Sequence, residues 1–154
     1  MDRNGAVIGL ISDTHGLLRP EALRALDGSD LIVHAGDVGK PEILDALKLL
    51  APVVAVRGNI DRGGWATALP MTTTVAVGLA AVYILHNLQQ LDLDPAAAGF
   101  HVVVSGTPTS LPARNVAASF TSIRAVPDRA ASSCPLPWRA WICGSRPGRW
   151  SSSI

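Results

Sequence analysis

Short apolar runs that alternate with helical patterns are the feature that most limits how this chain can fold. Residues 6–11, 31–33 and 53–56 form short runs with many branched side chains, which is typical of buried parallel strands. Between them, residues 20–26 and 41–50 carry apolar side chains at helical spacing, and each segment starts with a proline. The order strand, helix, strand, helix, strand predicts an α/β fold with right-handed crossovers.

The second half of this pattern predicts further strands. Residues 71–77 and 80–85, separated at Gly78, indicate a hairpin or two adjacent strands, and residues 102–104 indicate one more strand. Residues 91–98 predict a short helix. With 154 residues, 48% of them hydrophobic, the chain can fill the core of one domain but is too short for two comfortable ones.

Charge and cysteine content narrow the class of protein. Only 16% of the residues are charged and the formal net charge is +1, which excludes an overall basic nucleic-acid-binding protein. Two cysteines, Cys134 and Cys143, are too few for a disulfide scaffold and favour a reducing compartment. The chain starts without a signal-peptide pattern, and its longest apolar run, 75–85, is about half of a membrane crossing. We therefore expect a cytoplasmic protein that has no membrane partner.

Polar residues able to bind metal follow the predicted strands. Because the carboxyl ends of parallel strands meet at one edge of a sheet, these residues are expected to lie close together. Carboxylate, amide and imidazole groups beside glycines suit a pair of divalent ions, and Asp37 could bridge two ions about 3.5–4 Å apart. The four segments are Ser12-Asp13-Thr14-His15-Gly16, His34-Ala35-Gly36-Asp37, Arg57-Gly58-Asn59-Ile60-Asp61, and His86 after the run 80–85.

Each of these pieces has an ordinary structural interpretation. A lone Asp-x-His or Gly-Asp is common by chance and usually marks a turn. His34 is interpreted as a core histidine, and His101 as a structural or exposed residue at the start of a strand. Arg57 is either a surface or salt-bridge residue or a phosphate contact. The order of the four segments, rather than any one of them, favours a metal site.

These motifs, spread over residues 6–106, resemble the calcineurin-like metallophosphoesterase superfamily. The chain is most similar to its small single-domain bacterial and archaeal phosphodiesterases, because the larger phosphatases have a proton-donating histidine where this chain has Ile60. The resemblance implies a layered α/β/β/α sandwich. It also implies that Asp13 and His15 bind a first metal, that Asp37 bridges, and that Asn59 and His86 bind a second.

The resemblance further implies the chemistry of the site. Two divalent ions, with Mn²⁺ the first choice and Ni²⁺, Fe²⁺, Zn²⁺ or Mg²⁺ as alternatives, would hold a bridging hydroxide that attacks phosphorus in line. Asn59 would also orient a substrate oxygen, Asp61 would support a ligand, and Arg57 would contact a phosphate. The implied substrate is a small phosphodiester or phosphomonoester. Nucleic acid is disfavoured as a partner, and a homo-oligomer is left open.

The composition changes abruptly after residue 106. Residues 1–106 carry eleven acidic and seven basic side chains, whereas residues 107–154 carry one acidic and six basic side chains. The family pattern Gly-His-x-His is replaced by Gly106-Thr107-Pro108-Thr109, so two expected imidazole ligands are missing. We therefore divide the chain into a metallophosphoesterase core, 1–106, and an aberrant, poorly ordered tail, 107–154, with no strand expected in that tail.

A change of reading frame would explain this tail. When each codon is shifted by one base, Thr107 and Thr109 can both become histidine while Pro108 remains proline, and residues 123–126 permit the family's Asn-Pro-Gly-Ser. The alternative is a diverged or truly basic tail. Either way, the second sheet is expected to be incomplete and activity impaired. Two other interpretations remain: a non-catalytic binding module, as in a retromer subunit similar to this family, or a truncated inactive product.

Overall fold

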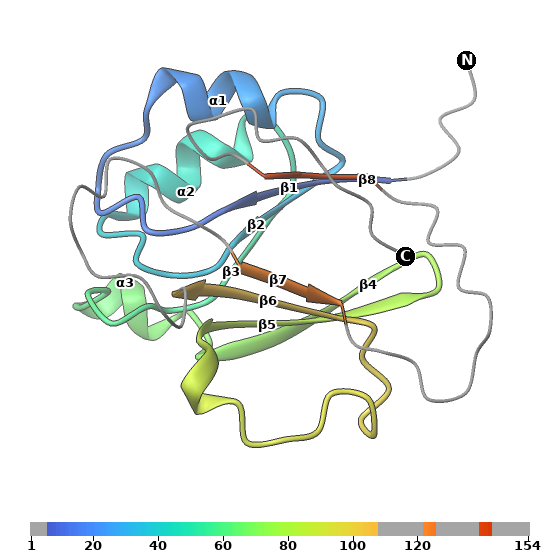
Figure 1. Ribbon diagram of the computed structural model, residues 1–154. Helices are drawn as coiled ribbons and strands as arrows, with labels where there is room; N and C mark the ends of the chain where they lie inside the picture. Colours follow the sequence, from blue (N-terminus) through green and yellow to red (C-terminus); the bar gives the residue numbers. More distant parts are fainter. Residues whose placement is uncertain (1–5, 108–121, 126–138, 143–154) are drawn as a thin grey trace, which may run out of the picture.

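The computed structural model describes residues 6–107, 122–125 and 139–142, and these residues form two four-stranded sheets packed face to face (Figure 1). The first sheet is parallel with the order β3-β2-β1-β8, and the second has the order β4-β5-β6-β7. The first sheet contains β1 (Val7–Ile11), β2 (Leu31–His34), β3 (Val53–Ala55) and β8 (Arg139–Ile142). The second contains β4 (Thr72–Val77), β5 (Ala80–Asn87), β6 (Val102–Thr107) and β7 (Ser122–Ala125).

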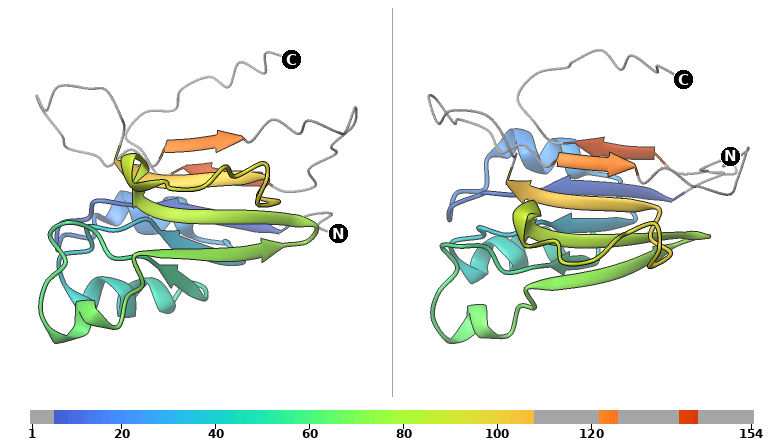
Figure 2. Two further views of the ribbon diagram at one scale, coloured as in Figure 1. Left: turned by 90° about the horizontal axis from the view of Figure 1, so that it is seen from below. Right: turned by 60° about the horizontal axis from the view of Figure 1, so that its bottom comes forward.

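Two helices cover the outer face of the first sheet, as Figures 1 and 2 show. Helices α1 (Pro20–Leu26) and α2 (Pro41–Lys48) each begin with a proline, whose fixed φ suits the first helical position. Their apolar faces pack on the side chains of the sheet that point away from the second sheet, including Ile11 and Ile32. Both helices were predicted from the sequence, and α2 ends two residues earlier than expected.

One of the two main clusters of the apolar core lies between the two sheets. Side chains alternate along each strand, so Ile8 and Leu10 of β1 face inward while Val82 and Ile84 of β5 face them from the second sheet. Full burial of each such side chain stabilises the fold by about 1.5–3 kcal/mol. The inter-sheet cluster consists of Ile8, Leu10, Val33, Ala35, Val56, Val82, Ile84, Val102 and Val104. The prediction of an α/β sandwich is therefore confirmed.

The outer face of the second sheet is covered by the segment that follows β5. The expected helix over residues 91–98 is wrong: only the short 3₁₀ helix η1 (Leu88–Gln90) forms there, followed by turns. The Asp94 carboxylate accepts the Ala96 amide at 3.0 Å, and a single turn then ends at Gly99 with φ 80°. Leu91 and Leu93, two residues apart, pack on this face of the sheet instead of following helical spacing.

The structure also contains elements that the sequence pattern did not predict. The one-turn helix α3 (Gly64–Thr67) follows β3. Two strands lie in the tail, where none was expected: β7 pairs antiparallel with β6, and β8 pairs parallel with β1. Each is only four residues long and includes an arginine, so no continuous apolar run marks it. The rest of residues 108–154 lies outside the described residues, and the proposed division of the chain at residue 106 stays a prediction.

None of the helices in the described ranges is both long and apolar enough to cross a membrane.

Candidate metal centre

The loops that follow β1 and β2 run together at one edge of the first sheet. The Asp13 amide donates to the Gly36 carbonyl at 2.9 Å, and the His15 amide donates to the Asp37 carbonyl at 3.0 Å. The sequence predicted that the polar residues after these strands lie side by side, and β1 and β2 are indeed neighbouring parallel strands. The two hydrogen bonds hold the loops together.

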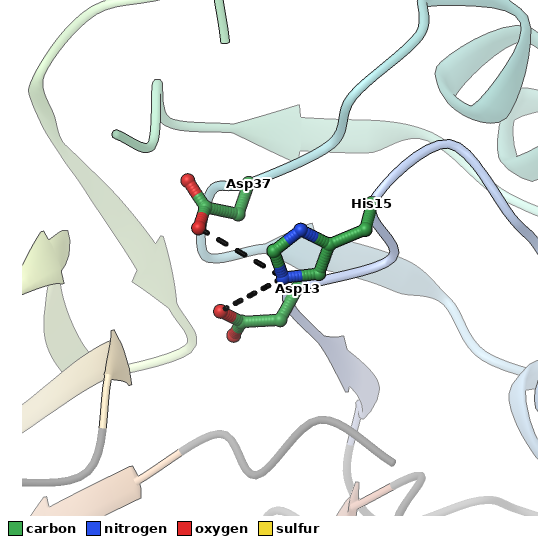
Figure 3. A group of neighbouring side chains, drawn as sticks. All are labelled: Asp13, His15 and Asp37. Carbon is green, nitrogen blue, oxygen red and sulfur yellow. Dashed lines mark ion pairs between the residues drawn. The ribbon is translucent and has the colours of Figure 1, made fainter. Parts of the chain in front are cut away.

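Asp13, His15 and Asp37 converge on one point (Figure 3). One ligand atom from each of the three side chains can be chosen so that all lie within 4.8 Å of one another. The His15 Nε2 atom is 3.9 Å from Asp13 Oδ1 and 4.0 Å from Asp37 Oδ2. The Asp37 side chain is buried, whereas that of His15 is half exposed, so the cluster is open to solvent on one side. Two carboxylates and an imidazole at this spacing suit a divalent cation.

The backbone of all three residues is left-handed. Asp13, His15 and Asp37 have φ values of 52°, 49° and 55°, and no other non-glycine residue in the described part of the chain has a positive φ. Such a conformation costs about 1–3 kcal/mol for each residue and persists only where the surrounding structure imposes it. Within the described residues, left-handed non-glycine backbone is thus confined to the three clustered residues.

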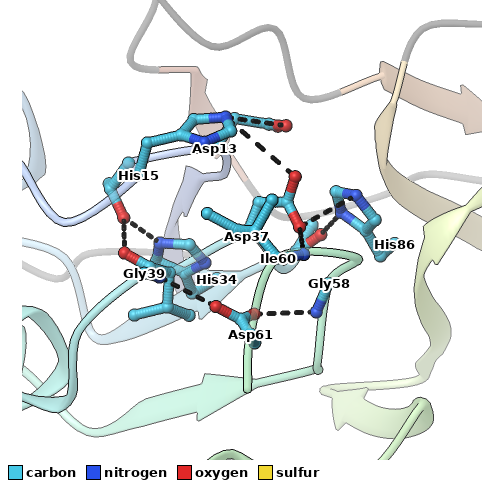
Figure 4. Close-up of polar contacts among 12 residues, drawn as sticks. Asp13, His15, His34, Asp37, Gly39, Gly58, Ile60, Asp61 and His86 are labelled. Atoms are coloured by element: carbon cyan, nitrogen blue, oxygen red, sulfur yellow. Dashed lines mark hydrogen bonds and ion pairs between the residues drawn. The ribbon is translucent and has the colours of Figure 1, made fainter.

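His86 reaches the same cluster from the second sheet. Its Nε2 atom lies 3.4 Å from Asp37 Oδ1, and its ring is 4% exposed (Figure 4). The Nδ1 atom is 2.8 Å from the Ala35 carbonyl and donates to it, so in the neutral ring the lone pair of Nε2 faces the Asp37 carboxylate. The sequence pattern predicted His86 directly after a strand, whereas in the structure His86 is the second-last residue of β5.

Burial shifts the pKa values of His86, Asp37 and Asp13 in one direction, whereas their hydrogen bonds and most neighbouring charges shift them in the other. Burial lowers the pKa of His86, but its hydrogen bonds to Asp37 and Ala35 outweigh burial, and the pKa is raised overall. Burial raises the pKa of Asp37, yet the hydrogen bonds from His86 and the Ile60 amide bring that pKa below its ordinary value. Burial raises the pKa of Asp13 and dominates over the hydrogen bond from Ser12 and the charge of His86. Asp37 is therefore the carboxylate that most readily stays ionised.

Asp61 ties two of the loops together (Figure 4). Its Oδ1 atom accepts the Gly39 amide and its Oδ2 atom accepts the Gly58 amide, both at 2.8 Å. Next to it, the Ile60 amide donates to Asp37 Oδ1 at 3.0 Å. The buried Asp61 carboxylate thus joins the loop after β3 to the loop after β2, and the role expected for it in supporting a ligand stays a prediction.

Asn59 and Arg57 lie on the same loop, and no hydrogen bond or ion pair within the described residues joins either side chain to Asp13, His15 or Asp37. Asn59 is exposed, and its side chain makes no hydrogen bond or ion pair within the described residues. Arg57 is half buried, and its Nε and Nη2 atoms approach Met71 Sδ at 3.2 and 3.1 Å. Sulfur is a weak acceptor, so this contact holds the guanidinium only loosely. The roles expected for both residues stay predictions.

The donor set of the cluster fits a divalent cation. The hard carboxylate oxygens and the imidazole nitrogen come from the loops after β1 and β2, and Gly58 lets the loop after β3 approach the Asp37 carboxylate. A Cβ at Gly58 would collide with the amide nitrogen and Oδ1 of Asp37.

Comparison with known proteins identifies the family. The sequence model of the calcineurin-like phosphoesterase superfamily domain matches residues 7–107. The chain belongs to this superfamily. The match coincides to within one residue with the range over which the motifs were found in the sequence.

Two archaeal members of the calcineurin-like phosphoesterases resemble this chain in sequence. A probable metallophosphoesterase of Methanocaldococcus jannaschii is 53% identical over 60 residues, which cover 36% of this chain and 31% of that protein. A probable metallophosphoesterase of Methanothermobacter thermautotrophicus is 37% identical over 112 residues, covering 65% of this chain and 64% of that protein. The match thus spans less than two thirds of either relative.

Solved structures agree on the calcineurin-like fold. Vacuolar Protein Sorting 29 from Cryptosporidium parvum superposes with a TM-score of 0.56 at 20% identity, covering 75% of this chain and 71% of that one. At this level of identity the likeness concerns the fold.

The sequence pattern did not predict a contact between His34 and Thr14 beside the calcineurin-like site. His34 is fully buried at the end of β2, as expected of a core histidine, but its Nε2 atom lies 3.0 Å from the Thr14 hydroxyl, between Asp13 and His15. His101 is structural as expected, since its Nδ1 atom accepts the Ala81 amide at 3.1 Å. No sequence signal pairs Thr14 with a histidine twenty residues away.

Proposed function

We propose that this chain is a metal-dependent phosphoesterase acting on small phosphodiesters or phosphomonoesters in the cytoplasm. The observation that carries the proposal is the convergence of Asp13, His15 and Asp37 in left-handed backbone. Membership of the calcineurin-like superfamily supports the reaction class.

The residues divide into two metal-binding groups in this proposal. Asp13, His15 and Asp37 hold one divalent ion, and Asp37, His86 and Asn59 hold a second, with Asp37 shared. Mn²⁺ is the first choice, and Ni²⁺, Fe²⁺, Zn²⁺ or Mg²⁺ are alternatives. When bound, such ions neutralise charge that develops on the phosphate oxygens.

The remaining side chains position the substrate and the loops. Asn59 is exposed at the rim, where its amide can orient a phosphate oxygen, and Arg57 can contact a second oxygen once it leaves the Met71 sulfur. Asp61 fixes the loop that carries Asn59, because it accepts two backbone amides across the two loops. The half-exposed His15 keeps the cluster accessible from solvent.

Impaired activity and a shifted reading frame after Gly106 are part of the proposal. The superfamily match ends at residue 107, next to the position where the change of frame is placed. Thr107 and Thr109 stand where the family resemblance implies two histidines. Loss of a group that only supports a ligand already costs 10–100-fold in metal affinity or activity, so the loss of two ligands is expected to cost more.

Hydrolysis of bis-p-nitrophenyl phosphate with Mn²⁺ tests the proposed activity. The chain is compared with a version whose residues after Gly106 are replaced by those encoded in the neighbouring frame. We expect metal-dependent turnover from the restored chain and turnover more than about tenfold lower from this chain. Turnover of this chain within tenfold of the restored one would contradict the impairment, and no Mn²⁺-dependent turnover from either would contradict the activity.

A non-catalytic binding module is the second candidate. The replacement of both expected histidines by Thr107 and Thr109 favours it, because a neutral hydroxyl is a poor substitute for an imidazole ligand. Calorimetric titration with Mn²⁺ separates these candidates: tight binding of two ions supports the enzyme, and no binding supports the module or a truncated inactive product.

A further inference from the structure

The turn that carries Asp13 and His15 is connected to the protein core through a side-chain pair. His34, the last residue of β2, is fully buried, and its Nε2 atom lies 3.0 Å from the Thr14 hydroxyl oxygen. The same hydroxyl lies 3.0 Å from the Val38 carbonyl and donates to it. Thr14 therefore links the loop after β1 both to the end of β2 and to the loop after β2.

The direction of each hydrogen bond follows from the donors available. A hydroxyl has one hydrogen, and the Val38 carbonyl can only accept, so Thr14 donates to Val38 and must accept from His34. The Nε2 atom of His34 thus carries the ring proton. The Nδ1 atom is then bare, which agrees with its having no hydrogen-bond partner among the described residues. Burial that keeps this imidazole neutral supports the same assignment.

The position of Thr14 explains why such a link matters. It lies between Asp13 and His15, both of which are held in left-handed backbone that a free turn would leave. The neighbouring amides of His15 and Gly16 donate to the carbonyls of Asp37 and Val38 at 3.0 and 2.8 Å. The Thr14 side chain and these two amides together fasten the turn to the loop after β2.

We propose that His34 and Thr14 are positioning residues that hold the turn Asp13–His15 in the conformation needed for metal binding. The consequence for metal affinity rests on the proposed function, whereas the conformational consequence does not. Neither residue touches the cation in this proposal. His34 acts through Thr14, and Thr14 acts through the backbone of its two neighbours.

Amide hydrogen exchange in the metal-free protein tests the conformational part. The variant Thr14→Val removes the hydroxyl at nearly constant volume, and Thr14→Ser retains it. We expect exchange of the His15 and Gly16 amides to accelerate about tenfold or more in Thr14→Val and to stay within about threefold in Thr14→Ser. The His101 amide, which bonds to Ala81 in the second sheet, serves as an internal control that should not change. Unchanged His15 and Gly16 exchange in Thr14→Val would overturn the proposal.

Calorimetric titration with Mn²⁺ alone tests whether Thr14 and His34 affect the metal affinity of the site. We expect Thr14→Val and His34→Leu each to weaken Mn²⁺ binding about 10–100-fold, and the double variant to be no weaker than the more affected single variant. His34→Gln, whose amide can donate near the position of Nε2, should restore part of the affinity. His101→Asn is the matched histidine control and should bind as the unmodified chain does.

The two parts of the experiment separate the possible failures. If the unmodified chain binds no Mn²⁺, the proposed function fails while amide exchange still decides the positioning role. Additive losses in the double variant, or unchanged Mn²⁺ affinity in Thr14→Val, would overturn the positioning role although the metal site stands. Because His34→Leu can also disturb packing, Thr14→Val on its half-buried loop supplies the deciding comparison.

Discussion

Asp37 is the side chain on which the candidate centre depends most. Its carboxylate accepts the Ile60 amide at 3.0 Å, lies 3.4 Å from His86 Nε2 and 4.0 Å from His15 Nε2. Asp37 therefore lies close to histidines from both sheets. An amide at this position would keep the size of the side chain but remove its charge and replace one oxygen by a donor.

We expect Asp37→Asn to weaken Mn²⁺ binding more than about 100-fold in a calorimetric titration, because the change removes a charged ligand rather than a supporting group. Asp45→Asn is the matched control, since Asp45 is exposed on α2 and pairs only with Lys48 at 3.1 Å. Asp45→Asn should leave the affinity within about twofold. Equal affinities of the two variants would show that Asp37 binds no metal.

The stability of the protein should depend on pH through His34. The pKa of His34 is lowered to about 4, chiefly by burial; the charges of Asp61 and Asp37 oppose this shift and the charge of His86 adds to it. The unfolded chain binds a proton near pH 6.5 and the folded chain does not, so stability is lost as the pH falls from about 6.5 toward 4. We expect the free energy of urea unfolding, measured with a chelator, to fall by about 2 kcal/mol between pH 7 and pH 5.

The variant His34→Gln provides the control for this pH effect. It removes the titrating ring, so the loss between pH 7 and pH 5 should shrink to the small slope left by the carboxylates. His86 acts in the opposite sense, because its pKa is raised in the folded state and the stability it contributes is lost as the pH rises. Both chains carry His86, so the difference between them isolates the contribution of His34. An equally steep loss in His34→Gln would assign the effect to another group.

At the scale of the elements, the loop after β3 must approach the loop after β2 closely. Gly58 makes this approach possible, because a Cβ there would collide with the amide nitrogen and Oδ1 of Asp37. The backbone of Gly58 is not left-handed, so the constraint is contact alone. Asp61 then holds both loops through the Gly39 and Gly58 amides.

We expect Gly58→Ala to destabilise the protein by about 1–3 kcal/mol in urea unfolding, because the loops must separate to admit the methyl group. The variant should also weaken Mn²⁺ binding. Gly64→Ala in α3 is the matched control, since a Cβ there meets nothing within 4 Å and the backbone is not left-handed. Equal stabilities of the two variants would mean that the loops tolerate separation.

The elements also show which parts of the fold a sequence can predict. The strands β1, β2 and β3 and the two helices were predicted because continuous apolar runs and helical spacing mark them directly. Residues 91–98 were mistaken for a helix, because Asp94 and Pro95 start a single turn whose apolar neighbours follow the second sheet. The strands β7 and β8 depend on partners far along the chain, which local patterns do not reveal.

For the site too, the sequence predicts the residues at strand ends but not the contacts between loops. Asp13, His15, Asp37 and His86 were predicted from their places at strand ends, and the structure brings all four together. The Thr14–His34 contact and the left-handed backbone depend on how two loops meet in space. Asn59 was predicted beside them; it is exposed on the loop after β3, and its role as a ligand stays a prediction.

At the scale of the whole molecule, the tail determines how much of the family's architecture is completed. Sequencing the gene through the codon for Gly106 is expected to show Gly-His-x-His in the neighbouring frame.

A chain with the restored tail should unfold at higher urea concentration, aggregate less and turn over more substrate, because further strands would cover apolar faces and sheet edges. The substitutions Thr107→His and Thr109→His alone should recover only part of the activity, because these strands would still be missing. If the neighbouring frame of the gene does not encode Gly-His-x-His after Gly106, the change of reading frame is excluded.

Anomalous diffraction from crystals grown with Mn²⁺ tests most directly whether the loops after β1 and β2, together with strand β5 of the facing sheet, build a metal centre. We expect a peak bounded by the carboxylates of Asp13 and Asp37 and the imidazole of His15, and a weaker peak between Asp37 and His86. Crystals of folded protein that bind Mn²⁺ elsewhere, or not at all, while these side chains keep their observed positions, would contradict the assignment of the centre.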